Sequence, residues 1–302
     1  MKAQLTSAIL GLSMLLAPLT PSPAALAAGS CSSSNCTFLP SLMTVQIPTV
    51  TGASYHQGIA KQWDLDNPVR LAPQHADKNL GLRGLVDVTD NDQGYYYYKG
   101  LINYGQDDNR TPQLPYLFNP ARGASGMRFL RTRDWNWQPS PQMGSQGGVI
   151  ARVLYPITGL SLPASVNERI YAPRTLVDNP IAPGYHMMVI YADESSIALK
   201  YSIEDSSATG YTLHIRGVRV DANLLALYRS LDGGNRYVFS GQGTQNYNLP
   251  YISAGQPIGF AIGTSIQVAL ADTGMFLDPR SCNEFWLGFT GNCPTRNGND
   301  IR

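Results

Sequence analysis

Short runs of alternating apolar and polar residues recur along the chain, and most are bounded by Gly, Pro, Asp or Ser. A period of two is typical of β-strands, because successive side chains point to opposite faces of a sheet. The pattern predicts strands at 43–47, 80–88, 95–104, 127–137, 149–155, 186–192, 196–203, 210–220, 251–262 and 265–271. We therefore expect a mainly β protein built from antiparallel strands.

One segment has the period of a helix instead. Apolar residues recur there at positions i, i+3, i+4 and i+7, namely Leu224, Leu227, Tyr228 and Leu231. Asp221 stands where an N-cap is favoured, and Gly233-Gly234 follows as a stop signal. The sequence therefore predicts one short helix at about 221–231.

The beginning of the chain has the pattern of a signal peptide. Met1-Lys2 is positively charged, residues 8–19 form an apolar run, and residues 24–28, four alanines around Leu26, supply the small residues that signal-peptidase cleavage requires. We therefore assign 1–28 to a signal peptide and expect a secreted, periplasmic or cell-surface protein. The apolar run is too short for a transmembrane helix, and no later segment is a candidate for one.

A change in the pattern near Gly148 divides the remaining chain. Upstream of it, loops rich in Pro and Gly interrupt the strands, whereas downstream the alternation is cleaner and the strands are longer. We expect a β-rich N-terminal region at 29–148 and a C-terminal β-barrel or sandwich at 149–302, and the second region carries the helix.

The charge balance narrows the choice of partners. The formal net charge is +1, only 14% of the residues are charged, and Lys and Arg form no cluster. Recognition of nucleic acid or of an anionic membrane surface needs a concentrated positive charge. We therefore expect neither as a partner.

The four cysteines lie near the two ends of the chain, Cys31 and Cys36 at one end and Cys282 and Cys293 at the other. In an oxidising compartment they predict two disulfides, with three possible connectivities. We favour Cys31 with Cys36 and Cys282 with Cys293, because each pair is close in sequence. A lipid-modified Cys31 is the alternative at the N-terminal end. We expect Trp286, inside the second loop, to pack on the C-terminal strands.

No catalytic residue, metal ligand or cofactor follows from the sequence. The Gly-x-Ser-x-Gly elbow of serine hydrolases is absent, and no two of the four histidines lie within four residues of each other (His56, His75, His186 and His214). The stretch 90–94 is similar to the start of a calcium loop, but it lacks the closing Glu and is more typical of a polar turn. The residues favour a non-catalytic protein over an enzyme.

Two tryptophans are the strongest candidate for a binding site. Trp135 and Trp137 are two residues apart in an extended segment, so their rings project to the same side. Beside Asp134 and Asn136, such flat rings are suited to stacking on sugar rings. The alternative interpretation is that both rings fill the core under a long loop, as large aromatic side chains usually do.

The C-terminal part resembles the barrel of lysostaphin-type zinc endopeptidases, which cut peptidoglycan cross-bridges. The likeness covers about the last 120 residues and lies in Gly255-Gln256-Pro257-Ile258-Gly259, the strand 265–271 and Asp278-Pro279. The resemblance places Ser265 and Gln267 where the family has its His-x-His zinc ligands, and neither can replace imidazole. In one register the resemblance aligns His214 with the family's non-ligand histidine, and in an alternative register Tyr201 and Ser202 stand there. The resemblance therefore implies a barrel without its metal.

A second resemblance spans most of the mature chain. The chain resembles a family of exported bacterial proteins to which we attach no activity. The segments that carry this resemblance include 75–80, 112–118, 134–137, 199–205 and 276–281. It implies one exported unit.

Three hypotheses follow. The first is a non-catalytic envelope or extracellular module that binds cell-wall glycan or peptidoglycan, with Trp135, Trp137 and His214 as candidate binding residues. The second is a structural subunit of a surface layer or filament, assembled from copies of the chain and suggested by its low charge and its Gly, Pro and Tyr content. The third is a hydrolase with a non-standard site, in which His214 or His186 acts with Glu204 or Asp205.

Overall fold

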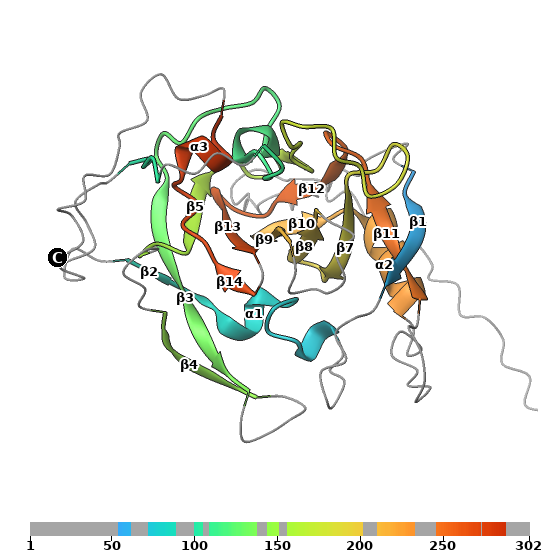
Figure 1. The fold of residues 1–302 in the computed structure, drawn as a ribbon, viewed down its shortest axis with the longest axis horizontal. Coiled ribbons are helices and arrows are strands. Elements are labelled where there is room, and N and C mark those ends of the chain that lie inside the picture. Colours follow the sequence, from blue (N-terminus) through green and yellow to red (C-terminus); the bar gives the residue numbers. More distant parts are fainter. Residues whose placement is uncertain are drawn as a thin grey trace, which may run out of the picture. The chain divides into compact units, whose positions relative to one another are not determined.

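The computed structural model describes residues 54–61, 72–88, 100–104, 109–137, 144–150, 156–201, 210–232, 246–272 and 274–287 (Figure 1). By internal contacts the chain divides into Met1–Gln46 and Ile47–Arg302, and all described residues belong to the second unit. The predicted signal peptide, the strand at 43–47 and the polar turn at 90–94 lie outside the described residues.

The main feature of the fold is an antiparallel sheet of 11 strands. Nine of them follow one another in the order β1 (His56–Lys61), β11 (Asn246–Ile252), β7 (Met187–Ala192), β8 (Ser196–Lys200), β9 (Thr212–Arg216), β13 (Ser265–Asp272), β5 (Gly159–Pro163), β3 (Arg128–Asn136) and β2 (Leu85–Asp87). At its sides, β14 (Met275–Phe276) pairs with β13, and β4 (Ser145–Val149) pairs with β3. The order has two open ends, so the described strands form no closed barrel.

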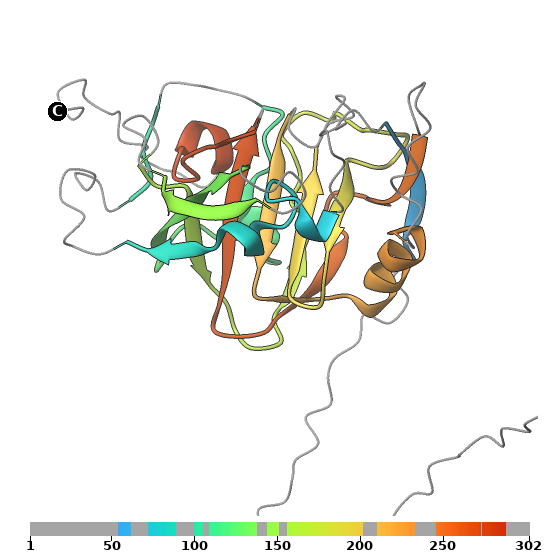
Figure 2. The same cartoon turned by 90° about the horizontal axis from the view of Figure 1, so that it is seen from below.

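A smaller sheet has three strands, in the order β10 (Val218–Val220), β12 (Pro257–Ala261) and β6 (Arg169–Tyr171). The prediction of a mainly β, antiparallel protein is confirmed. The predicted short helix is also present as α2 (Ala222–Asp232), whose N-cap Asp221 accepts hydrogen bonds from the backbone N–H groups of Asn223 and Leu224 at 3.0 and 3.2 Å. α2 packs against β11 and β7 (Figures 1 and 2).

Two long predicted strands are each divided in the structure. Gly217, with φ +76°, separates β9 in the large sheet from β10 in the small one. Gly255, with φ +75°, lies in the turn between β11 and β12. A positive φ is easily adopted only by glycine, and here it allows the chain to leave one sheet and enter the other.

The segment 80–88 was predicted to be one strand, and this is wrong for its first half. Residues Leu80–Arg83 form the short helix α1, because the Asn79 side chain caps it by accepting from the Gly81 N–H at 2.9 Å. Gly84, with φ +76°, then ends the helix, and β2 follows. The other short helical pieces are η1 (Ala72–Gln74), η2 (Leu114–Leu117) and α3 (Cys282–Phe285).

The large sheet contains strands from both sides of Gly148, the position near which the sequence pattern changes. β3, which lies upstream, pairs with β5, which lies downstream, through Phe129 with Leu160. β4, which includes Gly148, also pairs with β3. In the structure, strands from both predicted regions therefore share one sheet.

Both faces of the central strands are buried, and alternate residues face different clusters. On β13, Ile266, Val268 and Leu270 belong to the largest core cluster, which also contains residues of the small sheet, α2 and α3. Ala269 and Ala271 face a smaller cluster with Leu80 and Phe276. Residues 72–88, which we call the covering segment, thus pack on the face opposite the main core.

Candidate functional site

The candidate site lies where the covering segment meets the end of β3. β2 at the end of this segment pairs with β3 through Leu85 with Thr132 and Val86 with Arg131. Upstream, the Asn79 side chain donates to the Pro73 carbonyl at 3.0 Å and so closes the turn between η1 and α1. The short elements of the segment are therefore held to each other and to the sheet by hydrogen bonds.

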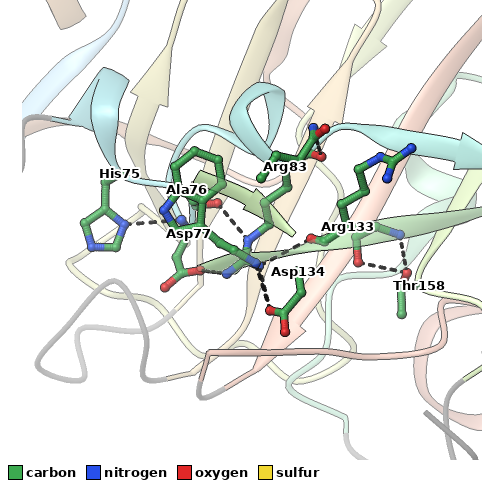
Figure 3. Close-up of polar contacts among 10 residues, drawn as sticks. His75, Ala76, Asp77, Arg83, Arg133, Asp134 and Thr158 are labelled. Carbon is green, nitrogen blue, oxygen red and sulfur yellow. Dashed lines mark hydrogen bonds and ion pairs between the residues drawn. The ribbon is translucent and has the colours of Figure 1, made fainter. Parts of the chain in front are cut away.

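Arg83 joins the covering segment to β3. Its buried guanidinium donates to the Asp77 carboxylate at 2.5 Å, to the Ala76 carbonyl at 3.2 Å and to the Arg133 carbonyl at 3.4 Å (Figure 3). It also lies 3.5 Å from an Asp134 carboxylate oxygen and stacks over the Phe276 ring. A planar, permanently charged group with several fixed donors is suited to linking separate backbone segments.

Asp134 provides an exposed carboxylate in a fixed position. One of its oxygens accepts from the Trp135 backbone N–H at 2.8 Å and faces Arg83, whereas the side chain as a whole is 73% exposed. Figure 3 shows Arg83 between Asp77 and Asp134. The carboxylate is thus oriented by the protein and still open to solvent.

Near the end of β3, three rings form what we call the aromatic row: His75, Trp137 and Trp135. Trp137 meets Trp135 edge to face at 6.3 Å between ring centroids, and it meets His75 edge to face at 5.3 Å. The two tryptophan rings lie together on one side of the strand, as their spacing predicts. Trp137 is partly exposed, but Trp135 and His75 are buried.

Trp135 is part of the protein interior, in line with the alternative interpretation of the sequence. Gly144 packs closely against the Trp135 indole, since a Cβ atom added at Gly144 would lie 2.3 Å from the indole Nε1. Within the described residues, that Nε1 is buried without a hydrogen-bond partner. Of the two tryptophan rings, Trp137 is therefore the one that reaches solvent, and Trp135 packs against it from the protein interior.

The imidazole of His75 has a defined orientation. Its Nδ1 accepts from the Asp77 backbone N–H at 3.2 Å (Figure 3), which places the proton of the neutral ring on Nε2. Asp77 in turn binds Arg83, so His75 belongs to the same network as the guanidinium.

His214 lies beneath the covering segment and is 1% exposed. On β9 it stands between Ala198 of β8 and Ala269 of β13, and its ring is 5.9 Å from that of Phe276. Burial lowers the pKa of His214 to about 4, and Arg83 acts in the same direction, although Asp77 and a backbone group of Lys78 oppose them. In this structure the ring of His214, a candidate binding residue from the sequence, is buried and does not reach solvent.

The structure also defines the surroundings of His186. Its Nε2 lies 2.8 Å from an exposed Asp178 carboxylate oxygen, and its Nδ1 accepts from the Ala254 N–H at 3.2 Å. The pairing with Asp178 was not predicted from the sequence. The expected alternatives, Glu204 and Asp205, lie outside the described residues.

In the described ranges, no three His, Cys, Asp or Glu side chains are grouped so that they could hold a metal ion. Ser265 and Gln267, the positions aligned with zinc-binding histidines, lie on β13. Cys282 is disulfide-bonded, and Cys31, Cys36 and Cys293 lie outside the described residues, so the pairing stays a prediction. The packing predicted for Trp286 is confirmed, because it is buried in the main core.

Sequence reasoning found the two tryptophans but missed Arg83, Asp77 and His75. The sequence pattern in the second half of the covering segment, at 80–88, predicts a strand. Its contacts with β3 join residues about fifty positions apart, such as Arg83 and Arg133, and no local pattern indicates them. The local signals were the Asn79 cap and Gly84, which together predict a short helical turn.

In the described parts of the chain, no helix has both the length and the apolar character needed to cross a bilayer. Comparisons of the chain with protein-family models, with curated proteins and with solved structures give no match.

Proposed function

We propose that this chain is an exported, non-catalytic module of the cell envelope or extracellular space that binds cell-wall glycan. The observation that carries the proposal is the aromatic row, in which the partly exposed Trp137 is supported by Trp135 and His75 beside the oriented carboxylate of Asp134. The export pattern at 1–28 supports the location, and the resemblance to a peptidoglycan hydrolase without its metal ligands supports the class of ligand.

The chemistry of a sugar ring fits this surface. One face of a pyranose presents C–H groups that pack on an indole, while its hydroxyl groups lie around the edge and need polar partners. Asp134, on the same stretch of β3, is a solvent-exposed acceptor, and Arg83 holds its carboxylate in place. Because the Trp135 N–H and Arg83 orient the carboxylate, little side-chain entropy is lost on binding.

The environments of three histidines support a binding role over a catalytic one. His75 and His186 each use Nδ1 to accept a backbone hydrogen bond, and His214 is buried and neutral. A general base must reach the proton that it removes. Trp137 and Asp134, by contrast, reach solvent at the edge of the covering segment.

Co-sedimentation with insoluble polymers tests the proposal. The full protein is incubated with purified sacculi, chitin and cellulose, and the bound fraction is compared with that of Trp137→Ala. We expect retention on at least one polymer and a loss of about tenfold in affinity for the variant, which corresponds to one lost stacking contact. Ile262→Ala is the matched control, because Ile262 is also an exposed apolar side chain but lies at the end of β12.

Two results would overturn the proposal. One is that no polymer retains the wild-type protein. The other is that Trp137→Ala and Ile262→Ala bind as tightly as the wild type, which would place the glycan elsewhere on the molecule.

A further inference from the structure

A second candidate site lies away from the aromatic row, where η2 and the loop after it meet β6 and the turn that precedes β12. A cavity of 290 Å³ opens there, and its lining includes Tyr116, Phe118, Asn119, Tyr171, Arg174 and Gly255. We call it the tyrosine pocket. At Gly255 a Cβ atom would meet nothing within 4 Å, so this turn leaves the pocket open on one side.

The walls of the tyrosine pocket are aromatic. Tyr116 and Tyr171 are partly exposed, whereas Phe118 is buried behind them. The guanidinium of Arg174 stacks on the Tyr116 ring at 4.0 Å and donates to its hydroxyl group. Stacking on a ring restricts an arginine side chain and leaves other N–H donors of the fork available to a ligand.

The pocket carries a positive charge on Arg174. Among the residues that the structure describes, no acidic side chain lines the pocket and no carboxylate forms an ion pair with Arg174. An arginine fork and a carboxylate fit each other through two parallel hydrogen bonds. The guanidinium of Arg174 therefore has the chemistry to pair with a carboxylate of a ligand.

A neighbouring cavity provides an internal comparison. It has a volume of 160 Å³, shares the Phe118 wall and contains Arg122, which stacks on Phe118 at 3.5 Å. Arg122 forms an ion pair with Glu168 at 3.1 Å and donates to the Pro163 carbonyl at 2.7 Å. The two cavities thus have a similar arginine on an aromatic ring, but only the arginine of the tyrosine pocket is left for an anion.

We propose that the tyrosine pocket binds one sugar ring that carries a carboxylate, with the acid on Arg174 and the ring between Tyr116 and Tyr171. The cavity is slightly below the lower end of the size range of small-molecule sites, which fits one ring and not a long chain. The inference rests on the proposed function in the class of ligand, a sugar, but it uses other residues. Together, the two proposals predict that an acidic sugar is a component of the bound glycan.

Ligand-observed NMR with D-glucuronate and with D-glucose tests the charge requirement. We expect saturable transfer to glucuronate and at least about tenfold weaker binding of glucose, because glucose cannot form the two charge-assisted hydrogen bonds of an arginine–carboxylate pair. Arg174→Gln should reduce glucuronate binding to the level of glucose. Arg169→Gln is the matched control, because Arg169 is also exposed and stacks on an aromatic ring, Phe260, but lies outside the pocket.

Acetate separates a sugar site from a simple anion site. If acetate displaces glucuronate at equal concentration, or if glucose binds as well as glucuronate, the proposal is overturned. Equal loss in Arg174→Gln and Arg169→Gln would also overturn it. If Arg174→Gln melts at a lower temperature than the wild type, Arg174→Lys replaces it in the test. Lysine keeps the positive charge but lacks the planar guanidinium, so this variant should also bind glucuronate more weakly than the wild type.

The results distinguish this proposal from the proposed function. Sacculus retention that depends on Trp137, together with no binding of glucuronate, removes the tyrosine pocket alone. Glucuronate binding that depends on Arg174, without any polymer retention, supports the pocket and removes the envelope-glycan proposal.

Discussion

Arg83 and His214 show how a few polar side chains position the covering segment. Arg83 is surrounded by acceptors from its own segment and from β3. His214 fits beneath the segment because its partners on both neighbouring strands are alanines, Ala198 and Ala269. Charge and side-chain size together therefore fix how the segment lies on the sheet.

His214 should make the stability of the protein depend on pH. Its pKa is lowered from 6.5 in the unfolded chain to about 4 in the fold, so the unfolded state binds the proton first as the pH falls. The stabilisation is fully present above pH 6.5 and is lost towards pH 4, with a total of ~3 kcal/mol. Urea titrations at pH 7, 5.5 and 4 measure this loss. In His214→Leu the loss should be smaller by that amount, and an unchanged pH dependence would contradict the assignment.

Replacement of Arg83 tests the link between the covering segment and β3. Arg83→Met removes the buried charge and leaves Asp77 without its partner, which should lower the free energy of unfolding by roughly 3 kcal/mol. Arg128→Met is the control, because Arg128 forms an exposed pair with Asp87 at 3.0 Å and should cost less than about 1 kcal/mol. Equal losses in chemical denaturation would show that Arg83 has no special role.

Gly144 tests the support behind Trp137. A Cβ atom there would overlap the Trp135 indole, and the backbone has φ +65°, so Gly144→Ala should destabilise the protein by about 2 kcal/mol. At Gly148, also on the β4 side of this hairpin, nothing lies within 4 Å of a Cβ atom, so Gly148→Ala should be nearly neutral. Thermal unfolding and near-ultraviolet circular dichroism report both effects. An unshifted transition in Gly144→Ala would mean that Trp135 is not held as described.

Among the secondary-structure elements, those with a long uniform pattern were predictable from the sequence. β7, β8 and β13 and the helix α2 have their expected positions to within a few residues, because alternation and the Asp221 cap are local signals. Gly217 and Gly255 were passed over, since an alternating pattern continues on both sides of each. The covering segment was unpredictable as a unit because its short pieces are stabilised by contacts with β3 and β13 that are distant in sequence.

The candidate site was predictable only in part for the same reason. The spacing of Trp135 and Trp137 places them side by side on any strand. Which ring is exposed depends on Gly144 and His75, and these approach from β4 and from the covering segment. The tyrosine pocket likewise combines residues from η2, β6 and the turn before β12, which no local pattern joins.

At the scale of the whole described chain, the C-terminal segment 278–286 binds residues 102–104 and 111–113. Asp278 accepts from Tyr104 at 2.6 Å and pairs with the buried Arg280, while the Gln113 side chain donates to the Glu284 carbonyl. Trp286 adds a hydrogen bond from its Nε1 to the Pro279 carbonyl at 2.8 Å. These contacts hold α3 on the main core.

The C-terminal disulfide should strengthen this closure. Changing Cys282 and Cys293 together to Ser should lower the melting temperature, with a loss of ~2 to 3 kcal/mol from the less restricted unfolded chain. Hydrogen exchange should increase at 277–287 and stay unchanged in β7, β8 and β9. Full retention of the melting temperature, or free thiols at both positions in protein from its native compartment, would contradict the predicted pairing.

One fluorescence titration tests the proposed role of Trp137 in glycan binding most directly. The chain has four tryptophans, and two of them, Trp135 and Trp286, are buried. Tryptophan fluorescence is followed while soluble glycan fragments from sacculi are added to the wild type and to Trp137→Phe. We predict a saturable change in the wild type and loss of most of its amplitude in the variant. No saturable change in the wild type, or curves of equal amplitude for both proteins, would contradict glycan binding at this ring.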